Sequence, residues 1–404
     1  MVSVFSICVP LFSCLLPCIH YLFNLTCCYF LLEVVVSLLK LSVKRLEEYL
    51  CSVYKKPAKV SRFFPLGVEE EVKAGRDLKG FGYGVPYVIE FIVGGEAKRI
   101  VLETMRSEGF GHDHFSDRSK ILLWQHSTFN KLPRHVRSVD VGAFTADGEG
   151  LKSLGDCGEF FIVTEFVDGR LYRFDLDRVK ETGRLSELDE RRCLALSDYL
   201  VEIHGVKREL PGLYVRRARE LVGHGECIMG LLDSYPPKLA FVVESDLTKI
   251  ERDCVVWRWR LKRKAHRLSQ VHGDFHPWNV LFREGTDFTV LDRSRGEWGE
   301  PADDVTAMTI NYIFYSLQKY GELAGAFERL FKLFWENYLR KTGDSEILGV
   351  VQPFYAWRGL VVASPVWYPS LSVDVRVKLL NFVRSVLRFD RFDLEGVNSY
   401  IREA

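Results

Sequence analysis

The segment VHGDFHPWNVLF, residues 271–282, places two histidines, one aspartate and one asparagine within eight positions between apolar residues. A buried strand is a poor place for them, because each polar group that leaves water without a hydrogen-bond partner costs about 1–3 kcal/mol. We therefore interpret residues 272–279 as a loop that is kept for its chemistry.

A predicted hairpin follows this loop. VLF at 280–282 and FTVLD at 288–292 are two short strands around the turn EGTD, which brings Asn279 and Asp292 together at the hairpin mouth. An amide oxygen and a carboxylate are hard ligands that suit Mg²⁺, which keeps several waters and shares substrate phosphates. Asp274 would then accept the proton of a hydroxyl that attacks a bound phosphate. The pattern predicts phosphoryl transfer.

Four motifs carry a resemblance to a known family. HGDFHPWN at 272–279 resembles the HxDxxxxN catalytic motif of the aminoglycoside phosphotransferase and choline kinase-like superfamily, and VLD at 290–292 resembles its metal-binding aspartate strand. GEPADDV at 299–305 resembles its G-x-P-x-x-D segment, and LVEIHGV at 200–206 the helix that precedes the catalytic motif. The resemblance is sharp at 272–305. It implies an α+β protein with a two-lobed protein-kinase-like fold, in which a small antiparallel-sheet N-lobe precedes a larger, mostly helical C-lobe.

The resemblance also implies roles for single residues. In the C-lobe, Asp274 is the catalytic base, and Asn279 and Asp292 bind magnesium. In the N-lobe, a glycine-rich strand covers the nucleotide phosphates, and backbone groups of the lobe connection hold the adenine. The residues implied for nucleotide binding are Gly80, Gly82, Gly84, Glu165 and Val167. ATP and Mg²⁺ are the implied cofactors.

The lysine that such kinases place on the third strand is replaced. IVLETM carries Glu103 at the aligned position, and a carboxylate cannot neutralise phosphate charge. In one interpretation, Arg118 or Lys120 of the next helix pairs with Glu103 and faces the phosphates. In the other, the alignment shifts, and Lys98 or Arg99 takes the role.

The charged run DRSRGEWGEPADD, residues 292–304, is expected at the mouth of the acceptor site. Its acids Glu297, Glu300 and Asp303 would attract a cation such as an aminoglycoside or a choline-like amine. Its two arginines would instead suit an acidic or phosphorylated acceptor. The alternative is that both arginines only pair with Glu297 or Asp303. The candidate mouth residues are Arg293, Arg295, Glu297 and Asp304.

The two loop histidines have the i, i+4 spacing of a helical zinc pair. Pro277 disfavours a helix there, because it removes a backbone hydrogen bond and clashes with the preceding turn. We expect His272 and His276 to be structural residues of the loop. His204 in LVEIHGV is likewise expected to pack at a helix end.

Two functions of different classes fit these residues. The first is an ATP-dependent kinase that moves the γ-phosphate to a hydroxyl of a small molecule. The second is a pseudokinase that acts as a nucleotide-binding or scaffold protein. Glu103 favours the pseudokinase, whereas the complete set of Asp274, Asn279 and Asp292 favours the enzyme. Protein phosphorylation is disfavoured, because no Asp-Phe-Gly and Ala-Pro-Glu pair bounds an activation loop.

The remaining patterns divide the chain at a buried strand, EFFIVTEFVDGR at 159–170, which we predict to end at its Asp-Gly break. The N-lobe is set at 40–167 and the C-lobe at 168–404. In the N-lobe we predict an amphipathic helix from Lys40, a hairpin around Gly94-Gly95 and a helix at 116–132. In the C-lobe, helical spacing covers 188–206, 215–235, 303–340 and 372–388.

Charge and cysteine content limit the partners. The formal net charge of +1 gives no basic excess for nucleic acid, so no nucleic-acid partner is expected. The ten cysteines show no CxxC spacing and no disulfide framework, which is typical of a reduced, cytoplasmic protein.

The first 39 residues form an apolar segment with no lysine or arginine and a single acid, Glu33. Residues 19–39 are long enough to span a bilayer of about 30 Å, and the lysines that follow would keep the body in the cytoplasm. The alternative is translated upstream sequence, with the true start near Val34–Val36. A membrane anchor is expected only if residues 19–39 are a genuine span.

Overall fold

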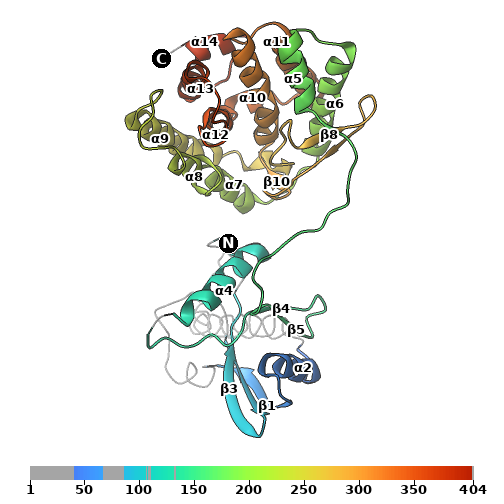
Figure 1. Ribbon diagram of the computed structural model, residues 1–404, viewed down its shortest axis with the longest axis vertical. Helices are drawn as coiled ribbons and strands as arrows, with labels where there is room; N and C mark the ends of the chain where they lie inside the picture. Colours follow the sequence, from blue (N-terminus) through green and yellow to red (C-terminus); the bar gives the residue numbers. More distant parts are fainter. Residues whose placement is uncertain (1–40, 67–85, 106, 108–110, 132, 403–404) are drawn as a thin grey trace, which may run out of the picture. The chain divides into compact units, whose positions relative to one another are not determined.

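The computed structural model describes residues 41–66, 86–105, 107, 111–131 and 133–402. The chain forms two compact units, Met1–Val163 and Thr164–Ala404 (Figure 1). The apolar segment 1–39 and the candidate phosphate-covering residues Gly80, Gly82 and Gly84 lie outside the described residues. Within the described part, none of the helices has the length and apolar character needed to cross a membrane.

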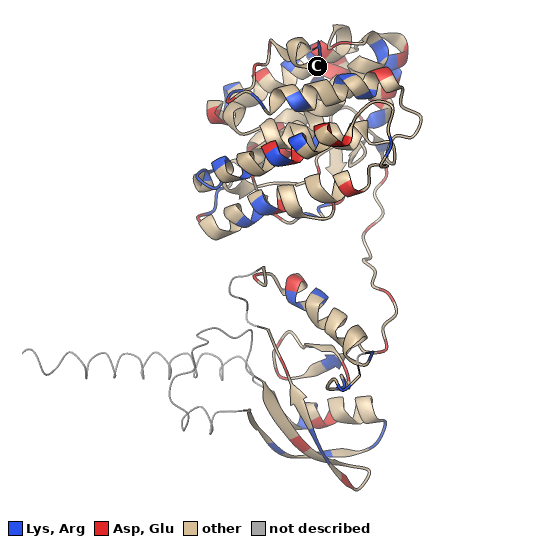
Figure 2. Ribbon diagram, turned by 90° about the vertical axis from the view of Figure 1, so that its left-hand side faces the viewer, with Lys and Arg blue, Asp and Glu red and all other residues tan. Residues whose placement is uncertain are grey.

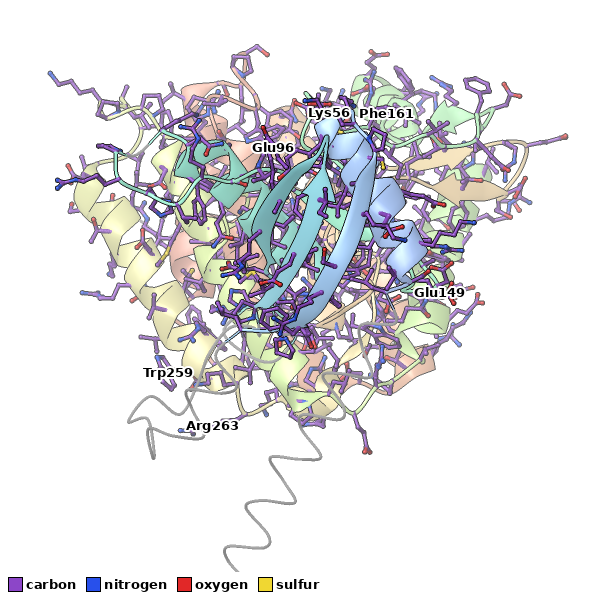
Figure 3. The ribbon with its side chains drawn as sticks, turned by 90° about the horizontal axis from the view of Figure 1, so that it is seen from below. Lys56, Glu96, Glu149, Phe161, Trp259 and Arg263 are labelled. Carbon is purple, nitrogen blue, oxygen red and sulfur yellow. The ribbon has the colours of Figure 1, made fainter. Side chains whose placement is uncertain are left out.

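The first unit is built on a three-stranded antiparallel sheet of β1 (Ala58–Pro65), β2 (Tyr87–Val93) and β3 (Glu96–Leu102). Gly94 and Gly95 join β2 to β3 with φ angles of 58° and 86°, a backbone that a two-residue hairpin turn requires and glycine tolerates. The predicted hairpin is confirmed. Leu46 and Leu50 of α2 (Val43–Tyr54) are buried against the sheet. Figure 3 shows this helix alongside the strands.

The first unit also contains α4 (Phe115–Phe129) and the hairpin of β4 (Gly142–Phe144) and β5 (Leu151–Ser153). The helix predicted at 116–132 is thus confirmed, but His114 rather than Ser116 caps it. The strand predicted at 159–170 is wrong. Residues 159–169 form no strand, and Phe161 and Phe166 are 89% and 88% exposed. A strand needs a hydrogen-bonded neighbour, and no described strand pairs with this segment.

The second unit is mostly helical and is organised around α10 (Pro301–Tyr320). Residues 304–317 of this helix are buried, and α5, α6, α11, α12 and α13 contact it (Figure 1). In Figure 2 the helices carry both blue and red positions on the face shown, so charges of both signs are mixed there. The other helices are α5 (Arg173–Thr182), α6 (Glu187–His204), α7 (Pro211–Gly223), α8 (Ile228–Asp233), α9 (Glu244–Leu261), α11 (Gly325–Thr342), α12 (Gln352–Ala363), α13 (Val373–Val386) and α14 (Val397–Arg402).

Two of the helical patterns in the C-lobe each cover two helices, and the single helix predicted at 215–235 is therefore wrong. The pattern at 215–235 covers α7 and α8, which residues 224–227 separate. The pattern at 303–340 covers α10 and α11, because Gly321 ends α10 in the left-handed region, with φ of 75°.

Short strands position the two charged loops of the second unit. β6 (Arg170–Leu171), β8 (Val280–Phe282) and β9 (Phe288–Val290) form one antiparallel sheet, and β7 (Ser269–Gln270) pairs with β10 (Trp298–Gly299). Loop 271–279 runs from β7 to β8, and loop 291–297 runs from β9 to β10. Because β7 pairs with β10, the start of loop 271–279 lies beside the end of loop 291–297. Because β8 pairs with β9, the end of the first loop lies beside the start of the second.

Candidate active site

A buried carboxylate holds loop 271–279 from the inside. Asp304, in the first turn of α10, is fully buried and accepts hydrogen bonds of 2.7 Å from the backbone N–H groups of His272 and Gly273. Its Oδ2 also lies 3.1 Å from Nε2 of His204, at the end of α6. Burial would raise the pKa of Asp304, but the hydrogen bond and charge of His204, together with His272, outweigh it and hold the pKa below its ordinary value.

This placement corrects the position predicted for Asp304. The residue was expected at the substrate mouth because it stands in a charged run, but its carboxylate points into the unit and binds the loop backbone. Sequence spacing did not reveal the difference between Asp303 and its neighbour, since both lie in the first turn of the same helix. His204 was expected to be a packed residue, and it is buried between Asp304 and Tyr338.

The two loop histidines bind the loop's own backbone. Nδ1 of His272 accepts the N–H of Asp274 at 3.2 Å, and Nδ1 of His276 accepts the N–H of Trp278 at 3.2 Å. Nε2 of His276 is therefore the protonated nitrogen, and it lies 3.4 Å from Asp274 Oδ2. Burial lowers the pKa of His272, which keeps this imidazole neutral.

Asp274 is the carboxylate at the centre of the loop. Its Oδ1 accepts a 2.6 Å hydrogen bond from Nη1 of Arg358, and its side chain is 14% exposed. Burial would raise the pKa of Asp274, but the charge of Arg358 and the hydrogen bond from His276 hold the pKa well below its usual range. The group is therefore an ionised acceptor with a fixed orientation.

Arg358 is the functional residue that sequence reasoning missed. From α12 it donates through Nη2 to Asp303 Oδ1 at 2.6 Å and to the Gly273 carbonyl at 3.0 Å. Its guanidinium carbon lies 3.8 Å from the centre of the Trp357 ring. Burial raises the pKa of Asp303 to about 6, although Arg358 acts in the opposite direction. The sequence does contain one signal for Arg358, because it is the only charged residue in the apolar helix QPFYAWRGLVVA.

Asn279 and Asp292 flank the hairpin mouth, as the predicted pairing of the two strands requires. Asn279 precedes β8, and its carbonyl accepts the N–H of Leu291, the residue before Asp292. Asn279 Nδ2 donates to the Asp274 carbonyl at 3.1 Å, which leaves Oδ1 available. Asp292 is exposed, has a left-handed φ of 55°, and forms no hydrogen bond or ion pair with a described residue. A strained backbone that presents a free carboxylate is typical of a binding site.

These two residues fit a hard divalent cation that completes its shell with water and phosphate oxygens. Among the described residues, no group of three or more His, Cys, Asp or Glu side chains could hold a metal. The protein would therefore supply Asn279 Oδ1 and the Asp292 carboxylate, and the remaining ligands would come from elsewhere. A cavity of about 310 Å³ lies beside Asp292, between α6 and residues 270–272 and 290–293.

The remaining residues of loop 291–297 are mostly engaged with the protein itself. Arg293 donates to the Val271 carbonyl at 3.0 and 2.8 Å, and Glu297 accepts from the indole of Trp298 at 2.6 Å. Arg295 lies deeper, with its Nε 4.0 Å from Asp274 Oδ1. The loop thus brings Arg295 to the candidate base and uses Arg293 to hold its own fold.

The first unit does not form the charge pair proposed for Glu103. Glu103 is exposed, and Arg118 donates to the carbonyls of residues 112 and 113 at 2.6 and 3.2 Å. Lys120 is exposed. Of the alternatives, Lys98 lies 3.8 Å from Glu96, and Arg99 lies 2.5 Å from Glu90. At the lobe connection, Glu165 is exposed and Val167 is half-buried.

The chain is similar to several solved kinases. One is the amicoumacin kinase hAmiN in complex with AMP-PNP, Ca²⁺ and Ami, with 15% identity over 80% of this chain and 91% of that chain and a TM-score of 0.39. An ethanolamine kinase from Plasmodium vivax is 13% identical over 83% and 82% of the two chains, with a TM-score of 0.33. The choline kinase LicA from Streptococcus pneumoniae is 10% identical over 85% and 97%, with a TM-score of 0.32. No curated protein gives a significant match.

A family model assigns the chain. The model described as "Phosphotransferase enzyme family" matches residues 135–338, about half of the chain, and this range contains both charged loops and Asp304. The α+β fold class and the superfamily predicted from residues 272–305 are confirmed. The chain therefore belongs to the phosphotransferase enzyme family, with a two-lobed kinase-like fold.

Proposed function

We propose that the protein transfers the γ-phosphate of ATP to a hydroxyl group of a small molecule. The observation that carries this proposal is the fixed, ionised Asp274, which is hydrogen-bonded to Asn279, while Asn279 pairs with the residue before the free carboxylate of Asp292. The loop after Asp292 runs directly through β10 into α10. It leaves no room for the long activation segment with which protein kinases bind a peptide, and this supports a small acceptor.

In this proposal, Asp274 orients the acceptor hydroxyl and takes its proton while the new oxygen–phosphorus bond forms. The bond from the γ-phosphorus to the bridging oxygen breaks, and ADP leaves. A strongly lowered pKa makes Asp274 a weak base, which suits a transition state in which the hydroxyl is oriented early and loses its proton late. Asn279 and Asp292 would hold Mg²⁺, which supplies positive charge to the phosphate oxygens.

The nucleotide-binding part of the proposal rests on the resemblance. Residues 40–167 would cover the nucleotide, with the phosphates near Gly80, Gly82 and Gly84 and the adenine at the backbone of Glu165 and Val167. Residues 168–404 would carry catalysis and acceptor binding. The experiment is a screen of purified protein against hydroxyl compounds for acceptor-dependent ADP release. Nucleotide binding without any turnover would support the pseudokinase alternative instead.

Replacing Asp292 by Ala is expected to abolish the effect of Mg²⁺ on nucleotide affinity, because the substitution removes the charged protein ligand of the metal. Nucleotide is titrated by calorimetry with and without Mg²⁺. Asp287→Ala is the matched control, since Asp287 is an exposed acid at the turn of the same hairpin. An Asp292→Ala protein with the wild-type Mg²⁺ effect would refute the assignment.

A further inference from the structure

We infer that Arg295 binds an anionic group of the acceptor, so that the acceptor is a hydroxyl compound that also carries a carboxylate or a phosphate. This inference rests on the proposed function, because it places the acceptor hydroxyl on Asp274. It also decides between the two acceptor classes that the charged run 292–304 left open.

Arg295 lies beside the candidate base in a fixed orientation. Its Nε is 4.0 Å from Asp274 Oδ1, and its guanidinium carbon is 4.5 Å from the centre of the buried Trp357 ring. The same ring carries the guanidinium of Arg358. An arginine that stacks on an aromatic ring is pre-organised, so it loses little side-chain entropy when it binds a carboxylate or phosphate.

The donors of Arg295 are poorly satisfied by the protein. Its Nε is buried and makes no hydrogen bond with any described residue. Its Nη1 lies 3.4 Å from the thiol sulfur of Cys227, a weak acceptor, and 3.8 Å from Glu226 Oε2. The Glu226 side chain is 66% exposed, so this contact is easily exchanged for another anion. The Arg295 side chain is 23% exposed, and a planar fork whose donors lack strong acceptors matches a carboxylate or phosphate.

The acidic side chains near Arg295 are poorly placed to bind a cationic acceptor, because they already have partners in the protein. Glu300 is buried and binds Arg267 at 2.8 Å and the Tyr214 hydroxyl at 2.6 Å. Asp303 is bound to Arg358 at 2.6 Å. Glu297 accepts the indole N–H of Trp298 at 2.6 Å and lies 3.8 Å from Arg208. Each of the three acids that were expected to attract an amine therefore already has a partner among the described residues.

The distance between Arg295 and Asp274 also limits the acceptor. A hydroxyl on Asp274 and an anion on Arg295 would each lie at hydrogen-bond distance from groups that are 4.0 Å apart. The hydroxyl and the acidic group should then be separated by a few bonds, as in a 2- or 3-hydroxy acid, a sugar acid or a short polyol phosphate.

The test measures binding and turnover with matched acceptors. Glycerate, gluconate and glycerol 3-phosphate are compared with glycerol, glucose and glucosamine. Calorimetry gives the affinity in the presence of AMP-PNP and Mg²⁺, and ADP release gives KM. We expect at least one acid to bind at least about tenfold more tightly than its neutral counterpart, and Arg295→Met to remove this difference.

Three variants sharpen the result. Arg208→Met removes the same charge from an exposed position near Glu297 and should leave acid affinity unchanged. Arg295→Lys keeps the charge but loses the planar fork and should be intermediate. Glu226→Gln removes the carboxylate that competes for Arg295 and should tighten acid binding about twofold to threefold.

The possible results separate the anionic-acceptor inference from the proposed phosphate transfer. Equal or tighter binding of the neutral compounds or of glucosamine would overturn the anionic acceptor while leaving phosphate transfer intact. An Arg295→Met protein that loses nucleotide affinity but keeps the preference for acids would also overturn the anionic-acceptor inference. Arg295 would in that case bind a phosphate of the nucleotide. If no acid binds, the inference is rejected. Acid binding that depends on Arg295 but gives no ADP release would uphold the anion site and count against the proposed function.

Discussion

Asp274→Asn is expected to lower turnover by about 10²-fold to 10⁴-fold, the range typical for the loss of a general base. The amide keeps the shape of the carboxylate but can neither take the proton of the acceptor hydroxyl nor orient it with a negative charge. Nucleotide affinity should stay near the wild-type value, because Asp274 is proposed to hold neither the nucleotide nor its Mg²⁺, for which Asn279 and Asp292 are the proposed ligands.

The measurement compares initial rates of wild-type and variant proteins with an acceptor found in the screen, and calorimetry reports nucleotide affinity for both. Asp287→Asn is the matched control, since it makes the same chemical change at an exposed position on the adjacent hairpin. Thermal unfolding separates loss of catalysis from loss of fold. If Asp274→Asn transfers phosphate at the wild-type rate, Asp274 is not the base.

Local patterns were sufficient for the elements that frame the site. β-rich runs around the Gly94-Gly95 turn predicted the first hairpin, and two short strands around the turn EGTD predicted β8 and β9. The placement of Asn279 and Asp292 at the hairpin mouth then followed from strand pairing alone. Such predictions succeed because the residues that decide them are close in sequence.

Partner choice over long sequence distances was not predictable in this way. Arg358 reaches Asp274 from 84 positions away, and it lies beyond the residues that the family model matches. The apolar run at 159–170 has the composition of a buried strand, but composition does not say whether another strand pairs with it. Asp303 and Asp304 are identical residues at adjacent positions, and only the packing of α10 decides that one binds Arg358 and the other binds the loop.

The fold around the base depends on Asp304, and Asp304→Ala is expected to lower the free energy of unfolding by about 3–5 kcal/mol. The substitution leaves the backbone N–H groups of His272 and Gly273 buried without an acceptor and removes the partner of His204 Nε2. Asp304→Asn should lose less, because the amide oxygen still accepts one of these hydrogen bonds.

Asp374→Ala is the control for that comparison. Asp374 also lies in the first turn of a helix, α13, but its side chain is 72% exposed and, among the described residues, is paired with Lys378 at 3.0 Å. The helix-dipole contribution is thus removed in both variants, and Asp374→Ala should cost at most about 1 kcal/mol. Urea unfolding of both proteins measures the difference. If Asp304→Ala costs no more than Asp374→Ala, the loop does not depend on this carboxylate. If it costs several kcal/mol more, acceptor turnover should fall with it, since the same hydrogen bonds that stabilise the fold fix the position of Asp274.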